Sequence, residues 1–376
     1  MRFAHIADTH LGYRQYGLFE RETDFYDHYS RLIDKIIEEK PDFIIHSGDL
    51  FETSRPPTKA LLTAQENFLK LKDAKIPVYA IAGNHDIVMR KNALPPQVLY
   101  KKFGLKLIGP KNQFYDHEGV FIGGSPYRSK YHSKSLLNNL EKLENAAQEY
   151  KKKIIVLHQA IDKYLPFEFE LKVGDLPNSF NYYAMGHLHT RILEDFGEGK
   201  LAYPGCPEIW RMDELGNYRK RGKGFNLVDM DEDIPAVEEV NVKISRKLLQ
   251  RRIDYSNFDE EIKELRDLIL KIDKKPIVEL VIKGKSYNRS LVHENLNKLF
   301  MDITLQIRSK YESATVPETG DIEIGSLNIH DLMIERLKEY DEKTAEYSVA
   351  IFERLSSGHN EDAAVITKKF FDEEFQ

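Results

Sequence analysis

Five short clusters of polar residues in the first half of this sequence carry the side chains that metal-dependent hydrolysis needs. They offer carboxylate, imidazole and amide groups, which together suit divalent first-row ions such as manganese, iron or zinc. A carboxylate can bridge two such ions, and Asp49 is the candidate for that position. The clusters are Asp8 and His10 (DTH), Asp49 (GDLF), Asn84, His85 and Asp86 (GNHD), His158 (LHQ), and His187 and His189 (GHLH). A pair of ions held by these groups would activate a water molecule for hydrolysis.

Each cluster directly follows a short apolar run, which predicts a strand buried on both faces. The predicted strands cover residues 3–7, 43–46, 78–82, 120–123, 154–157 and 182–185. Because the carboxyl ends of strands in an open α/β sheet line one crevice, we expect all the clusters to meet there. The DTH and GHLH pairs are predicted to be extended, which would put both side chains of a pair on the same side of the chain.

The alternation of predicted strands and helices indicates a layered α/β domain over residues 1–235. The acidic stretch 229–235 (DMDEDIP) ends in proline and predicts a domain boundary. A smaller α/β domain is expected over 236–313, with strands at 240–244, 277–282 and 303–307. Residues 314–327, which contain proline and glycine, predict a linker, and 328–376 return to the spacing of a helical tail.

The composition excludes some classes of protein. The 376 residues carry a formal net charge of −6, which argues against nucleic-acid binding by bulk charge but leaves room for local basic contacts. The single cysteine, Cys206, excludes an internal disulfide framework and favours a reducing compartment. No apolar run is long enough to cross a membrane, and the N-terminal residues predict a strand rather than a secretion signal. We therefore expect a cytoplasmic protein, associated with the nucleoid if the source is prokaryotic.

The residue sequences of the clusters, and their order along the chain, resemble the motifs of the calcineurin-like metallophosphoesterase superfamily. Within it, the chain is similar to the DNA double-strand-break repair nucleases of the meiotic-recombination-eleven (Mre-eleven) and SbcD family, archaeal members above all. The motifs that carry this resemblance are IADTHLG, SGDLFETSRPP, AGNHD, LHQ, GDLPNSFNYYAMGHLH and YPGCPE. The resemblance implies a four-layered β-sandwich flanked by helices, followed by a small α/β cap domain and a C-terminal helical tail.

The resemblance also implies two metal sites that share one carboxylate. One site would consist of Asp8, His10, Asp49 and His189, and the other of Asp49, Asn84, His158 and His187. His85 would lie near the scissile phosphate without binding metal, and Asp86 would orient its ring. The chain departs from the family at Glu52, because many members have histidine directly after the GDLF motif.

The activity that the resemblance implies is manganese-dependent hydrolysis of DNA. It would comprise 3′-to-5′ exonuclease activity on double strands and endonuclease activity on single strands, in the processing of double-strand breaks. Two alternatives stay open on the residues alone. One is a nucleotide phosphodiesterase or phosphatase of the same superfamily, and the other is a scaffold that tethers DNA ends.

Partners are expected at three surfaces. Basic and aromatic residues after the metal motifs are candidates for contact with DNA: Tyr13, Arg14, Arg55, Arg90 and Lys91. Apolar residues in helices near 58–74 and 94–99 predict a homodimer, as in the family. The resemblance implies that the tail binds a coiled-coil ABC-type ATPase through apolar residues, for which the candidates are Leu332, Leu337, Val349, Phe352 and Leu355.

Some polar residues outside the clusters have simpler interpretations. His5 and His46 lie within predicted strands and are expected to be core histidines or supports of the metal ligands. Asp24 and Asp27 are expected at the exposed start of a helix. The basic run 219–223 (RKRGK) predicts a solvated turn near DNA.

Overall fold

The computed structural model describes the whole chain except residues 88–92, 285–287, 314–341, 357–364, 368–369 and 371–376. The chain divides into two units, Met1–Glu312 and Ser313–Gln376, and each is described by itself. The predicted linker at 314–327 and the tail residues Leu332 and Leu337 lie outside the described residues. In the described part of the chain, every helix is too short or too polar to cross a bilayer.

The first of two large sheets holds the predicted strands of the N-terminal region. Its six strands lie in the order β12-β11-β1-β2-β3-β4, with β1 to β4 parallel and β11 and β12 antiparallel to their neighbours. The strands are β1 (Arg2–Ile6), β2 (Phe43–His46), β3 (Val78–Ala80), β4 (Leu105–Leu107), β11 (Gly224–Asp229) and β12 (Ala236–Asn241).

The second sheet has the order β5-β6-β7-β8-β10-β9. Its central strands β6, β7, β8 and β10 are parallel, and β5 and β9 pair antiparallel at the two edges. The strands are β5 (Phe114–His117), β6 (Val120–Ser125), β7 (Lys152–His158), β8 (Tyr182–Gly186), β9 (Ile192–Phe196) and β10 (Gly199–Tyr203).

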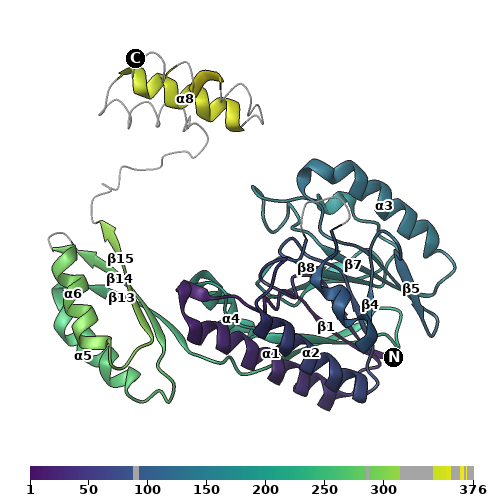
Figure 1. Ribbon diagram of the computed structural model, residues 1–376, viewed down its shortest axis with the longest axis horizontal. Coiled ribbons are helices and arrows are strands. Elements are labelled where there is room, and N and C mark those ends of the chain that lie inside the picture. Colours follow the sequence, from purple (N-terminus) through teal and green to yellow (C-terminus); the bar gives the residue numbers. More distant parts are fainter. Residues whose placement is uncertain (88–92, 285–287, 314–341, 357–364, 368–369, 371–376) are drawn as a thin grey trace. The chain divides into compact units, whose positions relative to one another are not determined.

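The two sheets pack face to face, with helices outside (Figure 1). Alternate residues of each strand point inward, so Phe3, Phe43 and Ile45 of the first sheet meet Ile154 and Tyr182 of the second in one buried cluster. The outer face of the first sheet is covered by α1 (Phe19–Glu39) and α2 (Thr58–Asp73), and that of the second by α3 (Ser133–Ala146). This arrangement confirms the predicted four-layered sandwich.

The prediction of a cap strand at 240–244 was wrong. Only the first two residues of this segment, Val240 and Asn241, lie in a strand, and they end β12, which pairs with β11 along its full length and so extends the first sheet to Asn241. The short helix α4 (Leu215–Arg221) precedes this pair of strands. The acidic stretch at 229–235 is therefore the turn of a hairpin, because a tight turn and a domain boundary share the same polar, proline-containing composition.

A three-stranded sheet with two helices follows, and we call it the cap. Its order is β13-β14-β15, with α5 and α6 packed on one face. The elements are β13 (Leu248–Asp254), α5 (Phe258–Ile269), β14 (Ile277–Gly284), α6 (Arg289–Phe300) and β15 (Gln306–Ser313). The cap core contains Ile253, Leu265 and Phe300, which are almost fully buried.

The other face of the cap sheet contacts the sandwich through a buried ionic cluster and a small apolar one. The Asp24 carboxylate on α1 accepts hydrogen bonds from Arg21 (2.9 Å), Arg246 (2.7 Å) and Lys274 (2.5 Å). Ile209 packs with apolar residues from the start of the cap in the same region. The expectation that Asp24 is exposed was wrong, since it is completely buried, whereas Asp27 is exposed as predicted.

In the second unit, the structure describes one long helix, α8 (Glu342–Ser356). It contains three of the predicted partner-binding residues, Val349, Phe352 and Leu355, and Phe352 is 38 % exposed.

Candidate active site

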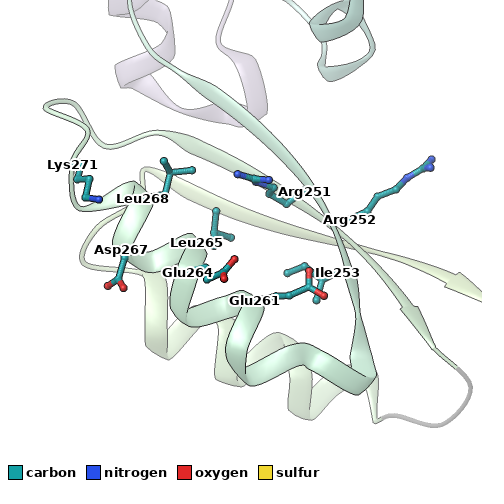
Figure 2. A pocket seen from close by; sticks show the side chains of 9 residues that line it. All are labelled: Arg251, Arg252, Ile253, Glu261, Glu264, Leu265, Asp267, Leu268 and Lys271. Atoms are coloured by element: carbon teal, nitrogen blue, oxygen red, sulfur yellow. The ribbon is translucent and has the colours of Figure 1, made fainter.

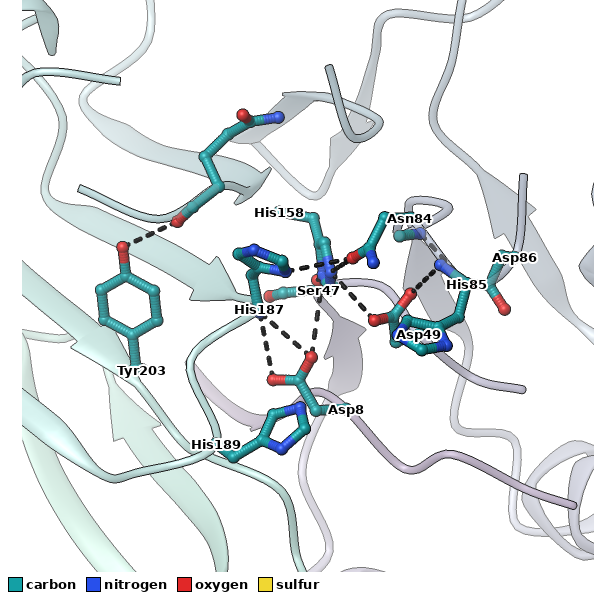
Figure 3. Close-up of polar contacts among 12 residues, drawn as sticks. Asp8, Ser47, Asp49, Asn84, His85, Asp86, His158, His187, His189 and Tyr203 are labelled. Atoms are coloured by element: carbon teal, nitrogen blue, oxygen red, sulfur yellow. Dashed lines mark hydrogen bonds and ion pairs between the residues drawn. The ribbon is translucent and has the colours of Figure 1, made fainter. Parts of the chain in front are cut away.

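The five polar clusters meet at the carboxyl ends of parallel strands, as predicted. Three follow β1, β2 and β3 of the first sheet, and two follow β7 and β8 of the second. Because the sheets pack face to face, the clusters of both converge at one edge of the sandwich (Figure 3). Each sheet thus contributes ligand atoms that the other cannot reach.

One candidate metal site gathers Asp49, Asn84, His158 and His187. His158 Nε2 lies 3.1 Å from Asp49 Oδ2 and 2.9 Å from Asn84 Oδ1. His187 Nδ1 lies 3.0 Å from the same Asn84 oxygen. Four donor atoms therefore face a common point, as an ion site of mixed nitrogen and oxygen ligands requires.

The other candidate site gathers Asp8, His10, His189 and again Asp49. His10 Nε2 and His189 Nε2 are only 3.1 Å apart, and His10 Nε2 lies 3.9 Å from Asp49 Oδ2. Asp8, His10 and His189 each offer a ligand atom that lies within 4.8 Å of those of the other two. Asp49 Oδ2 faces nitrogen atoms of both groups, which is the position of a bridging carboxylate.

Four of the candidate ligands have backbone conformations that side chains other than glycine rarely adopt. The φ angles are 53° at Asp8, 44° at His10, 54° at Asp49 and 91° at His187. The prediction that the DTH and GHLH pairs are extended was therefore wrong. Such left-handed residues are costly and concentrate at functional sites, because the fold must hold a side chain where an extended chain would not place it.

Two glycines allow this close approach. A Cβ atom at Gly83 would lie 2.1 Å from Asp49 Oδ1, and one at Gly48 would lie 2.4 Å from His158 Nδ1. Gly48 directly precedes Asp49 in GDLF, and Gly83 directly precedes Asn84 in GNHD. The glycine in these motifs is thus required by the packing of the ligands against one another.

Burial and neighbouring charge act strongly on the ionisable groups. Burial raises the pKa of Asp8 to about 6 and that of Asp86 to about 7. Burial also tends to raise the pKa of Asp49, but the nearby His158 outweighs it and holds that pKa well below its usual range. Burial tends to lower the pKa of His158, but Asp49 raises it to about 9, while burial lowers the pKa of His187 to about 3. The donor set fits divalent ions, because cations would compensate buried carboxylates that have few positive neighbours.

His85 lies beside both groups without joining either shared point. Its Nδ1 donates to the Glu52 carbonyl oxygen at 2.8 Å, and its backbone N–H donates to Asp49 Oδ1 at 2.9 Å. With Nδ1 occupied and the side chain 29 % exposed, Nε2 is the ring atom available to a substrate.

The predicted role of Asp86 in orienting His85 was wrong. The Asp86 carboxylate instead accepts hydrogen bonds from the backbone N–H groups of Leu50, Phe51 and Gly83. It therefore braces the GDLF loop against the GNHD loop. The ring of His85 is held instead by the Glu52 carbonyl oxygen, which accepts the hydrogen bond from its Nδ1.

Trp210 was not predicted as a site residue. Its ring centroid lies 4.5 Å from that of His189 and 5.5 Å from that of His10, and it stacks on Tyr13 at 5.0 Å. Its position two residues after the YPGCPE motif was the only signal in the sequence. The indole packs against one side of the group formed by Asp8, His10 and His189.

Comparison with known proteins agrees with this geometry. The family model for calcineurin-like phosphoesterases matches residues 1–191. The protein from Methanocaldococcus jannaschii called DNA double-strand break repair protein Mre11 is 40 % identical over 89 % of each chain. Proteins of the same name from Methanococcus maripaludis (35 % identical over 99 % of each chain) and Saccharolobus solfataricus (32 % over 96 % of each) are also similar.

The chain belongs to the Mre11 family. Its first domain is a metallophosphoesterase, and proteins with this domain bind divalent metal ions and hydrolyse phosphate esters. Among solved structures, TT1561 of Thermus thermophilus aligns with a TM-score of 0.40 at 12 % identity over 63 % of this chain and 97 % of its own, a likeness too slight to carry an argument.

The residues of this Mre11-family chain that were predicted to contact DNA have different surroundings. Tyr13 is partly buried by its stacking on Trp210. Arg14 is half exposed and pairs with Glu22 at 2.6 Å, and Arg55 is exposed. Arg90 and Lys91 lie outside the described residues.

Two surface depressions outside the metal clusters differ in charge. A groove of about 600 Å³ between α4 and β12 is lined by five cations, Arg219, Lys220, Arg221, Lys223 and Lys243, and one carboxylate, Glu239. A pocket of about 380 Å³ in the cap, between β13 and α5, has three cations, Arg251, Arg252 and Lys271, and three carboxylates, Glu261, Glu264 and Asp267 (Figure 2). Of these two depressions, the groove is the one with a net charge that attracts a polyanion.

Proposed function

We propose that this protein is a manganese-dependent DNA nuclease that processes double-strand breaks. The observation that carries the proposal is the pair of ligand groups that share Asp49, with His85 poised beside them. The ligand groups would be Asp8, His10, Asp49 and His189 for one ion, and Asp49, Asn84, His158 and His187 for the other. When bound, the two ions would activate a water molecule for attack and withdraw negative charge from the phosphate.

The protein side chains would then position the phosphate and handle a proton. His85 presents Nε2 because its Nδ1 is held by the Glu52 carbonyl. From that position the imidazole would stabilise the transition state or protonate the departing oxygen. Asp86 would act on the same site through the loops that it ties together.

The ligand chemistry is compatible with manganese, and the choice of that metal rests on the family resemblance. The groups contain carboxylate, amide oxygen and imidazole but no thiolate, since the single cysteine lies outside them. Three oxygen ligands, Asp8, Asp49 and Asn84, stand beside four imidazoles, a mixed set that suits manganese, iron or zinc. The family resemblance implies manganese, together with 3′-to-5′ exonuclease activity on double strands and endonuclease activity on single strands.

DNA is the proposed substrate because the relatives are called DNA repair proteins and because the α4 groove is basic in an acidic chain. In the groove, Arg221 pairs with Glu239 and Lys223 with Glu214. The remaining cations, Arg219, Lys220 and Lys243, are exposed and could contact phosphates. We place the work of the protein in the cytoplasm, at the nucleoid. We keep the proposed nuclease domain, cap and helical tail, with the nuclease domain now extending through β12 to Asn241.

A homodimer is proposed through α2 and the 3₁₀ helix η2 (Pro96–Phe103). These neighbouring elements and the loop before η2 expose Leu62 (47 %), Leu69 (38 %), Leu94 (70 %) and Leu99 (58 %). Exposed leucines gathered in this way suit a self-complementary interface. The double variant Leu62→Lys, Leu99→Lys should sediment as a monomer; a variant that remains dimeric would remove this surface from the proposal.

The tail is proposed to bind a coiled-coil ABC-type ATPase. The exposed Phe352 and its neighbour one turn away on α8, Val349, would lie in a groove of the partner. Deleting the chain after Gly325 should abolish co-purification with the ATPase and spare nuclease activity. Co-purification of the truncated protein would contradict the proposal.

The decisive experiment compares the wild type with Asp49→Ala on end-labelled double-stranded DNA and manganese. Degradation by the wild type alone would support the nuclease. Cleavage of a small phosphodiester without degradation of DNA would favour a nucleotide phosphodiesterase. If neither substrate is cleaved but DNA ends are bridged, the protein is a tethering scaffold.

A further inference from the structure

The candidate metal-binding histidines each have a second ring nitrogen that points away from the shared ligand atoms. His158 Nδ1 lies 2.7 Å from the Ser47 carbonyl oxygen. His10 Nδ1 lies 2.8 Å from Glu52 Oε2. An acceptor on this second nitrogen fixes which nitrogen carries the proton and leaves the other lone pair for the metal.

The contact between His10 and Glu52 is the closest approach of a carboxylate to any of these second nitrogens among the described residues. The corresponding distances are 3.8 Å from His187 Nε2 to Glu170 and 3.8 Å from His189 Nδ1 to Glu214. In the described part of the chain, His10 Nδ1 and Glu52 Oε2 are both buried and neither makes a hydrogen bond, although the two atoms lie within hydrogen-bonding distance of each other. The N–H group is not ideally aligned with the oxygen, and a small rotation of the carboxylate would align it.

We propose that Glu52 is a positioning residue that holds His10 with its Nε2 toward the metal ion of the Asp8, His10, Asp49 and His189 site. The inference rests on the proposed function, because it needs an ion at that site. His10 is fully buried and the Glu52 side chain is 19 % exposed, so a charge-assisted hydrogen bond between them is little weakened by water. The carboxylate also makes the imidazole a stronger ligand.

A role in holding His10 accounts for a carboxylate at an otherwise unfavourable place. Glu52 Oε2 lies 3.8 Å from the ring of His85, beside which a negatively charged phosphodiester would have to bind. An unpaired carboxylate there would repel the substrate. Pairing with His10 directs its charge toward the metal ligands instead.

Glu52 acts on its two histidine neighbours through different atoms. Its side chain faces His10, whereas its backbone carbonyl accepts the hydrogen bond from His85. Substitution of the Glu52 side chain therefore disturbs the metal site that contains His10. It leaves the backbone carbonyl that holds His85 in place. The effect should appear in metal affinity, and saturating manganese should restore the reaction rate.

The test is a calorimetric titration of the full-length protein with manganese. Glu52→Ala and Glu52→Met should each bind one of the two ions 10- to 100-fold more weakly than the wild type. Glu52→Gln keeps an acceptor oxygen and should lie between them and the wild type. Quenching of Trp210 gives a second readout without substrate, because this single tryptophan touches both His10 and His189.

The outcomes separate this inference from the proposed function. Glu141→Ala removes an equal charge from the exposed face of α3 and should titrate like the wild type. If Glu52→Ala does not fold, the similar length of Met makes Glu52→Met the deciding variant. Wild-type affinity for both ions in Glu52→Met would overturn the inference alone, whereas a wild type that binds no manganese would overturn the metal centre itself.

Discussion

The metal-ligand loops and the cap follow opposite rules of construction. In the loops, buried carboxylates and histidines face one another, and four of them have left-handed backbone conformations. In the described part of the cap, every residue other than glycine has an ordinary negative φ, and the core is apolar. The charges of the cap pocket balance, with three cations against three carboxylates.

This difference separates residues kept for chemistry from residues kept for folding. Strained and buried polar groups lower stability unless a ligand compensates them, so their concentration in the loops points to bound ions. The cap core is apolar and needs no bound ligand to compensate a loss of stability. Its link to the sandwich consists instead of the ionic cluster around Asp24 and the small apolar cluster around Ile209.

The largest effect should come from His85→Ala, which removes the proposed acid from the metal-ligand loops and leaves the metal-ligand groups intact. We expect a loss of about 10²- to 10⁴-fold in the rate of DNA cleavage at saturating manganese, because a positioned acid or base contributes this much. Single-turnover cleavage of end-labelled DNA measures the rate, and calorimetry measures the ions bound.

The control for His85→Ala is removal of the metal from the wild type with a chelator. Activity should then disappear entirely and return when manganese is added back. If His85→Ala itself fails to bind two ions, His85 is a ligand and its assignment to the phosphate is wrong.

The next largest effect should come from Asp24→Ala, which breaks the link to the cap without touching the loops. Loss of this buried carboxylate leaves Arg246 without a carboxylate partner and Arg21 with only Glu208 at 3.6 Å, so we expect a loss of about 3–5 kcal/mol in the free energy of unfolding. Urea unfolding followed through Trp210 fluorescence measures it, because Trp210 is adjacent to Ile209 in the apolar cluster at this junction.

The matched control is Asp27→Ala, which removes the same group from the exposed side of the same helix. It should change the unfolding free energy by less than about 0.5 kcal/mol. Equal stability of the two variants would mean that water or a rearranged side chain replaces Asp24, and that the cluster does not fasten the cap.

The sequence alone predicted the sandwich and the place of the site well. Buried parallel strands appear as continuous apolar runs, and the polar residues that end them must meet. The edge strands β5 and β9 escaped prediction because they are short and partly exposed, and so have no such run. The hairpin at β12 was assigned to the cap because its turn has the composition of a linker.

Contacts between distant residues could not be predicted from spacing. Nothing local distinguishes Asp24, which is buried among cations from the cap, from Asp27, which is exposed. Likewise, GNHD gives no sign that Asp86 turns toward the GDLF backbone while the Glu52 carbonyl takes His85. Such pairings depend on where the loops cross, and this is set by the packing of the two sheets.

The smallest expected effect is on DNA binding. It tests whether the basic groove beside α4 contributes more to that binding than the charge-balanced pocket of the cap. Arg219→Ala combined with Lys220→Ala should reduce the slope of log affinity for double-stranded DNA against log salt by about 2, because each lost phosphate contact lowers it by about 0.9. At physiological salt the same double variant should bind roughly tenfold more weakly. Fluorescence anisotropy at several salt concentrations measures both quantities.

The matched pair in the cap is Arg251→Ala combined with Arg252→Ala, which removes the same charge beside three carboxylates. Because neighbouring acidic groups already offset these arginines, their loss should change the salt slope by less than about 1. A larger change from the cap pair than from the groove pair would reverse the comparison. DNA would then lie across the cap, and the charge around α4 would serve only to pair with Glu214 and Glu239.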